Sequence, residues 1–417
     1  MSAQSNSLKA GHAARGQELT RRQFIAGTGA AALGFTILQP GLVRGAEANS
    51  KINLGLIGCG GRGQFVINYF AQHGSFNIAA CSDYFQDRVD AVGQKHQIPA
   101  GKRFTGLAGY KRVLEQKVDA VAIETPPYFH PEQAAAAVDA GKHVYLAKPI
   151  AVDVPGCLSI EESGKKATAK KLGFFIDFQT RAHPAYQEVA QRIKKGDIGK
   201  IINCEAAYQT STMFAGIDSQ IRKEPNNKEL RLRGWAVDRI LSGDVITEQN
   251  IHALDVATWL LDAAPVRAYG AGGRVRDFVG TCWDHYAVIF YFPNDVLVSF
   301  NSKQVGAQAE DIMCRVYGMK GYADTHYGGK VTLRSNEEVF NGDTPNLYAD
   351  GVVRNVATFY KSLMDGDYSN PTVAPSVRSN LTTILGRTAA YKGGEVTWDQ
   401  IMKKKEKWVA DLKGLKA

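Results

Sequence analysis

The sequence predicts an α/β Rossmann domain built on a doubly wound parallel sheet, followed by an α+β domain with a large, mostly antiparallel, open-faced sheet. Three observations support this fold class. A glycine-rich loop joins an apolar strand to a helix, strands and helices then alternate as far as residue 177, and the later strands follow one another with few helices between them. Alternation favours a parallel sheet, whereas consecutive strands favour antiparallel pairing. We therefore expect a NAD-binding domain at residues 49–177 and a substrate-binding and oligomerisation domain at residues 178–417.

The composition is that of an ordinary globular protein. The chain has 417 residues, 44% hydrophobic and 22% charged, with a formal net charge of +9. These values exclude a disordered, collagenous or disulfide-scaffold protein, and the length suffices for two domains. Three of the nine excess charges belong to residues 1–48, and the rest are spread along the chain. A charge this mild predicts no nucleic-acid partner.

Residues 1–48 have the pattern of a Tat-type signal peptide. Arg21 and Arg22 directly precede an apolar run at residues 24–38, and a small-x-small cleavage site ends at Ala48. The run is too short to cross about 30 Å of hydrocarbon, although an uncleaved membrane tether stays open. The pattern predicts a periplasmic or otherwise extracytoplasmic protein, with the Tat translocase as its partner during export. Because Tat cargo crosses the membrane folded, the pattern also favours a protein that is loaded with a cofactor before export.

The Rossmann domain is expected to open with a strand at residues 51–57 and a helix at residues 64–72. In the G-x-G-x-x-G loop between them, Gly58 permits the tight turn, Gly60 lets the backbone approach a pyrophosphate, and Gly63 lets helix and strand pack closely. The first N–H groups of the helix favour phosphate. The loop residues expected at a dinucleotide are Gly58, Cys59, Gly60, Gly61, Arg62 and Gly63.

A second strand at residues 76–81 leads to Asp83, 20 positions past the last glycine of the loop. A carboxylate there accepts hydrogen bonds from the ribose hydroxyls and repels a 2′-phosphate, so the sequence favours NAD over NADP. Arg62 and Arg88 are close enough in sequence to weaken that preference. An ordinary glycine loop is the weaker interpretation, because strand, helix and acidic residue all stand where a dinucleotide site needs them.

The alternation continues to the end of the first domain. Further strands are expected at residues 119–124, 143–146 and 172–177, and helices at residues 131–140 and 154–169. Ligands of a parallel sheet bind beyond the carboxyl ends of its strands. These ends carry Gly58, Asp83, Thr125, Pro126 and Lys148.

The second domain is expected to be rich in strands. Strands are predicted at residues 201–208, 268–272, 285–292, 296–302, 313–316 and 322–326. Helices are predicted at residues 184–195, 347–365, 376–391 and 398–412. Residues 216–234, rich in charge and Asn, predict a long loop that walls the substrate site.

Three segments resemble the Gfo/Idh/MocA family of oxidoreductases. They are Glu-Thr-Pro-Pro-Tyr-Phe-His at residues 124–130, Ala-Gly-Lys-His-Val-Tyr-Leu-Ala-Lys-Pro at residues 140–149, and Gly-Asp-Val-Ile-Thr-Glu-Gln-Asn-Ile-His at residues 243–252. The resemblance covers essentially the whole chain after residue 48. It implies a NAD(P)-dependent oxidoreductase acting on a hydroxyl or keto group of a sugar, polyol or glycoside, and a homo-oligomer formed through the C-terminal sheet. Because free NAD is scarce outside the cytoplasm, we expect the cofactor to be tightly bound.

The resemblance also assigns the candidate residues. Lys148 matches the lysine of the family's Glu-Lys-Pro motif, His252 matches its catalytic histidine, and Arg181 matches a position near the nicotinamide. Histidine suits the removal of a hydroxyl proton near neutrality, and lysine suits the stabilisation of a developing alkoxide. Catalytic roles are expected for Lys148, His252 and Glu248. Cofactor contacts beyond the glycine loop are expected from Asp83, Thr125, Pro126, His130, Lys148 and Arg181, and substrate contacts from Lys148, Arg181, Trp235, Glu248 and His252.

Two positions depart from the family. Ala147 stands where the motif has glutamate, which removes a carboxylate that holds the lysine and leaves the pose of Lys148 open. Glu248 stands where the family usually has Asp, which implies a reshaped substrate site. Its spacing of four from His252 predicts that both lie on one helical face, where the carboxylate either orients the imidazole or contacts a substrate hydroxyl.

Each candidate has a purely structural alternative. Lys148 could be a solvated strand end, His252 a core histidine and Arg181 a surface residue. Trp235 either stacks on a sugar ring or anchors packing, and His130 either binds cofactor or orients its proline-rich loop. The six cysteines are expected to be buried thiols. No motif has metal-ligand spacing, so we expect no metal.

Three functions stay open on the sequence alone. The first is oxidation or reduction of a sugar, polyol or glycoside hydroxyl. The second is redox-neutral glycoside cleavage, in which transient oxidation acidifies a neighbouring C–H and permits elimination, hydration and re-reduction. The third is a non-catalytic, cofactor-bound sugar-binding protein.

Overall fold

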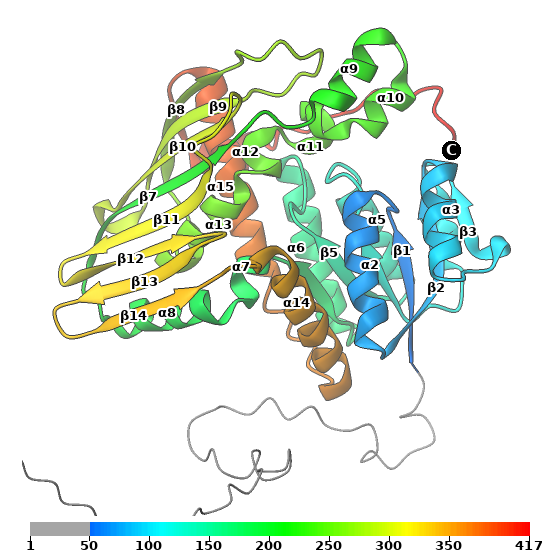
Figure 1. Cartoon of the computed structure of the whole chain (residues 1–417), viewed down its shortest axis with the longest axis horizontal. Helices are drawn as coiled ribbons and strands as arrows, with labels where there is room; N and C mark the ends of the chain where they lie inside the picture. Colours follow the sequence, from blue (N-terminus) through cyan, green and yellow to red (C-terminus); the bar gives the residue numbers. More distant parts are fainter. Residues whose placement is uncertain (1–50) are drawn as a thin grey trace, which may run out of the picture. The chain divides into compact units, whose positions relative to one another are not determined.

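The computed structural model describes residues 51–417, which contain a six-stranded sheet and a nine-stranded sheet within one unit (Figure 1). The signal-peptide prediction for residues 1–48, including the arginine pair and the cleavage site, lies outside the described residues. No helix within residues 51–417 has the length and apolar character that a membrane crossing takes.

The first sheet has the order β3-β2-β1-β4-β5-β6, and every neighbouring pair is parallel. Its strands are β1 (Ile52–Ile57), β2 (Phe76–Asp83), β3 (Arg103–Thr105), β4 (Ala120–Ile123), β5 (His143–Ala147) and β6 (Phe174–Asp177). All four residues of β4 are buried, as expected for a parallel strand covered on both faces. The doubly wound parallel sheet predicted from the alternation is confirmed.

The helices of this half connect and cover the parallel strands. They are α2 (Gly61–His73), α3 (Gln86–Lys95), α4 (Gly109–Leu114), α5 (His130–Asp139) and α6 (Val154–Ala169), with a short 3-10 turn η1 (Ala100–Lys102). Helix α14 (Leu347–Asp365), from near the end of the chain, packs on the same side as α2. Its Phe359 joins Phe70 and Tyr145 in one buried aromatic group.

The second sheet has the order β14-β13-β12-β11-β7-β10-β9-β8-β15 and is antiparallel except for the pair β7 and β10. Its strands are β7 (Ile201–Thr210), β8 (Arg267–Gly273), β9 (His285–Tyr291), β10 (Leu297–Gln304), β11 (Asp311–Gly318), β12 (Gly321–His326), β13 (Lys330–Ser335), β14 (Val339–Asp343) and β15 (Glu395–Thr397). Helices α13 (Ile251–Leu261) and α15 (Val373–Lys392) pack on one face. The predicted large, mostly antiparallel sheet is confirmed.

Short helices fill the rest of the second half. They are α7 (Gln179–Ala182), α8 (Pro184–Lys195), α9 (Ala215–Lys223), α10 (Lys228–Arg233), η2 (Trp235–Val237), α11 (Arg239–Ser242), α12 (Val245–Glu248), η3 (Pro293–Asp295) and α16 (Trp398–Lys404).

Two sequence predictions for this half are wrong. The expected loop at residues 216–234 contains helices α9 and α10, the second capped by Asn227, whose side chain accepts from two backbone N–H groups of the first turn. The expected helix at residues 398–412 ends at Lys404, because Lys405 takes a left-handed conformation with φ of 45°. All six cysteines are buried and unpaired, as predicted.

Candidate active site

Lys148 lies just past the carboxyl end of β5, and Glu248 holds its ammonium group. The Nζ atom donates to the main-chain oxygen of Glu248 at 2.7 Å and lies 3.7 Å from its carboxylate oxygen Oε1. The side chain of Lys148 is 13% exposed. Burial lowers the pKa of Lys148, and the carboxylate of Glu248 opposes that shift. The lysine is therefore a buried, oriented group and not a solvated strand end.

Glu248 and His252 do not share a continuous helix, so that part of the prediction is wrong. Helix α12 ends at Glu248 and α13 begins at Ile251, because the N–H groups of Gln249 and Asn250 both turn back to the carbonyl of Val245. The carboxylate of Glu248 consequently faces Lys148 and accepts from the side-chain amide of Gln249.

His252 is the second residue of α13 and is buried, with 7% of its surface exposed. Its ring meets the ring of Tyr327 edge-on, with centroids 5.2 Å apart, and stacks toward Tyr208 at 6.5 Å. Within residues 51–417 its Nδ1 has no hydrogen-bond partner. Burial lowers the pKa of His252 well below its ordinary value, and the charge of Lys148 adds to this, so the imidazole is neutral near pH 7. Buried ring nitrogens are normally paired, and this one lacks such a partner in the described part of the chain.

A buried charge cluster lies at the neighbouring strand ends. The guanidinium of Arg62 pairs with Asp177 at the end of β6, lies 3.8 Å from a carboxylate oxygen of Glu124 after β4, and covers the ring of Tyr348. Burial raises the pKa of Glu124 to about 8, although Arg62 opposes the shift. Within residues 51–417, neither carboxylate oxygen of Glu124 has a hydrogen-bond partner.

The glycine loop has the shape that a dinucleotide phosphate needs. Gly58 has φ of +100°, and a Cβ there would lie 2.6 Å from the backbone of Glu124. A Cβ on Gly63 would lie 1.9 Å from the carbonyl oxygen of Gly58. A Cβ on Gly61 would meet nothing within 4 Å, and the first N–H groups of α2 have no acceptor within the helix. These residues therefore fit a pyrophosphate.

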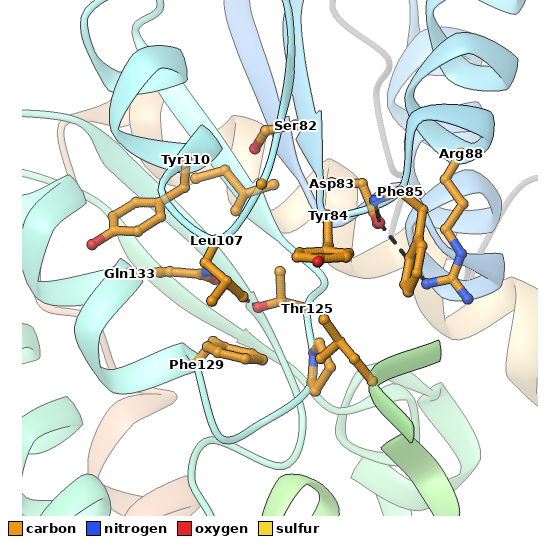
Figure 2. Close-up of a pocket in the computed structure, with 14 residues that line it drawn as sticks. Ser82, Asp83, Tyr84, Phe85, Arg88, Leu107, Tyr110, Thr125, Phe129 and Gln133 are labelled. Atoms are coloured by element: carbon orange, nitrogen blue, oxygen red, sulfur yellow. Dashed lines mark hydrogen bonds and ion pairs between the residues drawn. The ribbon is translucent and has the colours of Figure 1, made fainter. Parts of the chain in front are cut away.

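An open cavity lies beside this loop (Figure 2). Asp83 forms part of its polar wall and accepts from the backbone N–H groups of Cys59 at 2.8 Å and Phe85 at 3.0 Å. Arg88 lies 4.0 Å from the same carboxylate. The remaining walls are largely apolar, and they include Tyr84, Phe85, Leu107, Phe129 and Leu232. A carboxylate among aromatic and aliphatic walls fits an adenosine, so we name this space the adenosine cavity.

The three predicted residues of the proline-rich loop, Thr125, Pro126 and His130, lie in two different surroundings. Thr125 and Pro126 line the adenosine cavity, and the hydroxyl of Thr125 donates to Gln133 at 2.6 Å. His130 bridges two main-chain oxygens, that of Thr125 at 2.7 Å and that of Pro149 at 2.8 Å. Burial lowers the pKa of His130 to about 4. These contacts indicate that His130 orients the loops that contain Thr125 and Pro149. This is the structural alternative that the sequence left open for His130.

Arg181 and Trp235 lie apart from the Lys148–His252 pair in their contacts. The guanidinium of Arg181 is held by the buried carboxylate of Asp255 and covers the ring of Phe178. Trp235 packs with Leu232 and Leu241 in a small apolar cluster beside the adenosine cavity. The contacts of Trp235 are therefore those of a residue that anchors packing, and not those of a residue that stacks on a sugar ring.

Several residues of the site were not predicted from the sequence. Glu124 follows β4 and Asp177 ends β6, at the edge of the sheet where ligands were expected to bind. An acidic residue at such a strand end could therefore have been included among the candidates. Tyr208 and Tyr327 come from the second sheet and have no local motif. Tyr208 donates to Gln249 at 2.5 Å, and Gln249 in turn donates to Glu248.

The glycine loop, the adenosine cavity and the buried lysine and histidine define a NAD(P)-dependent oxidoreductase. Comparison with known proteins identifies the family. Residues 52–172 match "Oxidoreductase family, NAD-binding Rossmann fold", and residues 186–324 match "GFO/IDH/MocA C-terminal domain". The chain belongs to the Gfo/Idh/MocA family.

Relatives within the family have different named activities. The inositol 2-dehydrogenase of Serratia proteamaculans is 26% identical over 365 residues, which cover 83% of this chain and 95% of the relative. The 2,7-anhydro-N-acetylneuraminate hydratase of Escherichia coli is 26% identical over 225 residues, 54% of this chain and 53% of the relative. Among solved structures, an oxidoreductase domain protein from Kribbella flavida has a TM-score of 0.70 at 17% identity, covering 84% of this chain and 99% of its own. That likeness shows the fold.

Proposed function

We propose that this protein oxidises or reduces a hydroxyl or keto group of a sugar, polyol or glycoside, with NAD as cofactor and Lys148 and His252 as the catalytic pair. The observation that carries the proposal is the combination of a lysine held by Glu248 with a buried histidine that packs against Tyr208 and Tyr327. The sugar and polyol names of the relatives support the substrate class.

The cofactor would be held by the glycine loop and by Asp83, and when bound it supplies the hydride acceptor for oxidation and the donor for reduction. In the oxidative direction the neutral imidazole of His252 accepts the hydroxyl proton. The ammonium of Lys148, charged and held by Glu248, stabilises the oxygen as negative charge develops on it. In the reductive direction the same groups return the proton.

The test is a panel of sugars and polyols mixed with the purified protein and NAD, with the nicotinamide absorbance as the readout. We expect a change with at least one substrate, and its loss in Lys148→Ala while cofactor binding persists. Lys166→Ala, which removes a surface lysine of α6, is the matched control. Equal turnover by both variants would refute the role of Lys148.

A second candidate function is redox-neutral cleavage of a glycoside. The similarity to a hydratase that acts on an anhydro-sugar acid favours it, since that name describes addition of water to a sugar with no net oxidation. Release of the aglycone without accumulation of NADH would select this reaction. Stoichiometric NADH formation would exclude it as the sole activity.

We also propose that the protein is exported by the Tat route and works outside the cytoplasm. The arginine pair at Arg21 and Arg22 and the small-x-small site before residue 49 support this. Replacing both arginines by lysine should hold the protein in the cytoplasm in cell fractionation, and Arg15→Lys is the control. The mass of the mature chain reports whether the signal is cleaved or kept as a tether.

We propose further that the outer face of the second sheet joins copies of the chain. Three large apolar residues of this face are each at least 40% exposed: Tyr269, Ile289 and Leu297. Tyr269 and Ile289 are direct neighbours across β8 and β9. Light scattering should give an oligomer that Ile289→Glu dissociates. A monomeric mass for the unaltered chain would contradict this proposal.

A further inference from the structure

The end of the described chain returns to the nucleotide half. We call residues 406–417 the C-terminal strap; it follows α16 and runs past α10 to the edge of the parallel sheet, where the red end of the chain lies in Figure 1. The strap lies beyond both family matches, which end at residues 172 and 324. The roles proposed for the glycine loop and for Lys148 and His252 do not explain why the strap returns to the nucleotide half.

The strap is tied to the loops that follow four parallel strands. The N–H of Trp408 donates to Asp153, after β5, at 2.8 Å, and that of Ala410 donates to the hydroxyl of Tyr128, after β4, at 3.1 Å. The N–H of Lys416 donates to the hydroxyl of Tyr84, after β2, at 3.1 Å. After β3, the N–H of Leu107 donates to the carbonyl of Lys416 at 3.0 Å. The strap therefore runs along the carboxyl edge of the sheet, where ligands of such sheets bind.

The fit is tight at Gly106, which precedes Leu107. Gly106 has φ of +95°, and a Cβ there would lie 2.0 Å from the main-chain oxygen of Ala417. Glycine at this position thus leaves room for the strap. Gly106 and Leu107 also line the adenosine cavity, so one short segment contacts both the cavity and the strap.

Helix α10 closes the same region from the other side. Lys228 ties it to the strap, pairing with Asp411 at 2.7 Å and donating to the carbonyl of Lys413 at 2.8 Å. Arg233 ties it to the Rossmann domain through two hydrogen bonds to Asp87 of α3, at 2.9 and 3.0 Å. The side chain of Leu232 forms part of the cavity wall.

Two residues of the adenosine cavity are bound directly by these elements. The hydroxyl of Tyr84 donates to Glu229 of α10 at 2.7 Å and accepts from the strap. The guanidinium of Arg233 covers the ring of Phe85, 4.0 Å from its centroid. Both aromatic residues stand beside Asp83 in Figure 2. The walls of the cavity are thus held in place from the second half of the chain.

We propose that the strap and α10 form a clamp that closes the adenosine end of the cofactor site and retains the nucleotide. The inference rests on the proposed assignment of this cavity to NAD. With the clamp in place, Tyr84, Phe85 and Leu107 keep their positions around the adenosine. Departure of the nucleotide then requires the contacts of the strap and α10 to break first, and release is slow.

The experiment measures release of NADH from the purified protein. The full chain, a variant lacking residues 406–417, and Lys228→Ala are loaded with NADH, and an excess of NAD⁺ is added while the fluorescence of bound NADH is followed. We expect the truncation to raise the dissociation rate about tenfold or more, and Lys228→Ala to raise it by about threefold, since lost contacts act mainly on dissociation. Lys223→Ala, at an exposed lysine of α9, should match the full chain.

Hydrogen exchange gives a second readout that does not depend on turnover. The backbone amide of Leu107 should exchange faster in both clamp variants, because its acceptor is on the strap. If the truncated chain does not fold, the NADH dissociation rate of Lys228→Ala alone tests the clamp. Equal dissociation rates in the full chain and Lys228→Ala overturn the clamp alone. Failure of the full chain to bind NADH overturns the cofactor assignment as well.

Discussion

Glu248 gives Lys148 its position in this protein. The family motif has glutamate just before the lysine, and here Ala147 takes that place without a carboxylate. Glu248 supplies both a main-chain oxygen and a carboxylate to the ammonium group. In this chain the carboxylate that holds the lysine therefore comes from the end of α12 and not from the neighbouring residue of β5.

Glu248→Gln should lower kcat/KM about tenfold and shift its pH profile. Because the carboxylate raises the pKa of Lys148, its loss lowers that pKa, and the alkaline limb set by loss of the lysine charge moves to lower pH. The check is kcat/KM against pH, with Glu188→Gln on α8 as the control. An unmoved alkaline limb would show that the carboxylate does not act on the lysine.

Asp83 should decide between NAD and NADP. Its carboxylate faces the adenosine cavity with Arg88 nearby, so Asp83→Ala removes a charge that repels a 2′-phosphate and leaves one that attracts it. We expect the preference, measured as the ratio of kcat/KM values, to move toward NADP by about tenfold. Adding Arg88→Ala should cancel the gain; an unchanged ratio in Asp83→Ala would contradict the assignment.

Glu124 should make folding stability depend on pH. Its pKa is raised to about 8 in the folded protein, against about 4.3 for an unfolded chain. The folded state keeps the proton that the unfolded state has lost between these values, so stability falls as pH rises from about 4 to about 8. Relative to the unaltered chain, Glu124→Gln should gain about 3–4 kcal/mol between pH 5 and pH 8 in urea denaturation. A constant difference would contradict the buried, protonated carboxyl.

At the scale of elements, Asp244 caps the N-terminus of α12 and fixes the orientation of this helix. It has φ of 69° and is fully buried, and its carboxylate accepts from the N–H groups of Val245 at 2.6 Å and Trp283 at 3.0 Å and from the hydroxyl of Tyr391. The residue thus joins α12 to the segment before β9 and to α15, and it orients the segment that carries Glu248.

Asp244→Ala should cost about 2–4 kcal/mol of unfolding free energy, because three buried donors lose their acceptor. Asp244→Asn, which tolerates positive φ and keeps one acceptor oxygen, should cost less. Asp277→Ala, at a side chain 96% exposed, is the control. Thermal and urea unfolding measure all three; an effect of Asp244→Ala no larger than the control would contradict this role.

The elements that the sequence predicted well are those with strong local periodicity. Five of the six strands of the parallel sheet, all but β3, and helices α6, α8 and α14 fall close to their expected ranges. Helix α10 was missed because six residues form a stable helix only through tertiary contacts, here with Asp87 and the strap. The break between α12 and α13 likewise depends on hydrogen bonds that residue spacing does not reveal.

The residues of the site likewise divide into those that a local motif predicts and those that depend on tertiary contacts. The glycine loop, Asp83, Lys148 and His252 follow from motifs, since each carries its chemistry in a short segment. Which side chains meet depends on strand order and on the second sheet. The contact of Arg62 with Asp177 joins α2 to β6, and the contact of Lys148 with Glu248 spans 100 positions of sequence.

At the scale of the whole molecule, the last quarter of the chain binds the two halves together. Helix α14 packs against the Rossmann sheet, α15 lies under the second sheet, and the strap returns to the adenosine cavity. The nucleotide half is therefore completed by residues far from it in sequence.

The central claim is that Lys148 and His252 carry out proton and charge transfer for an oxidoreductase with a bound nicotinamide. A single-turnover experiment tests it most directly: protein loaded with one equivalent of NAD⁺ is mixed rapidly with the best substrate of the panel, and reduction of the bound nicotinamide is followed. We predict that Lys148→Met and His252→Gln slow this step by about 10²- to 10⁴-fold with cofactor affinity unchanged. Reduction at the unaltered rate in both variants would contradict the account.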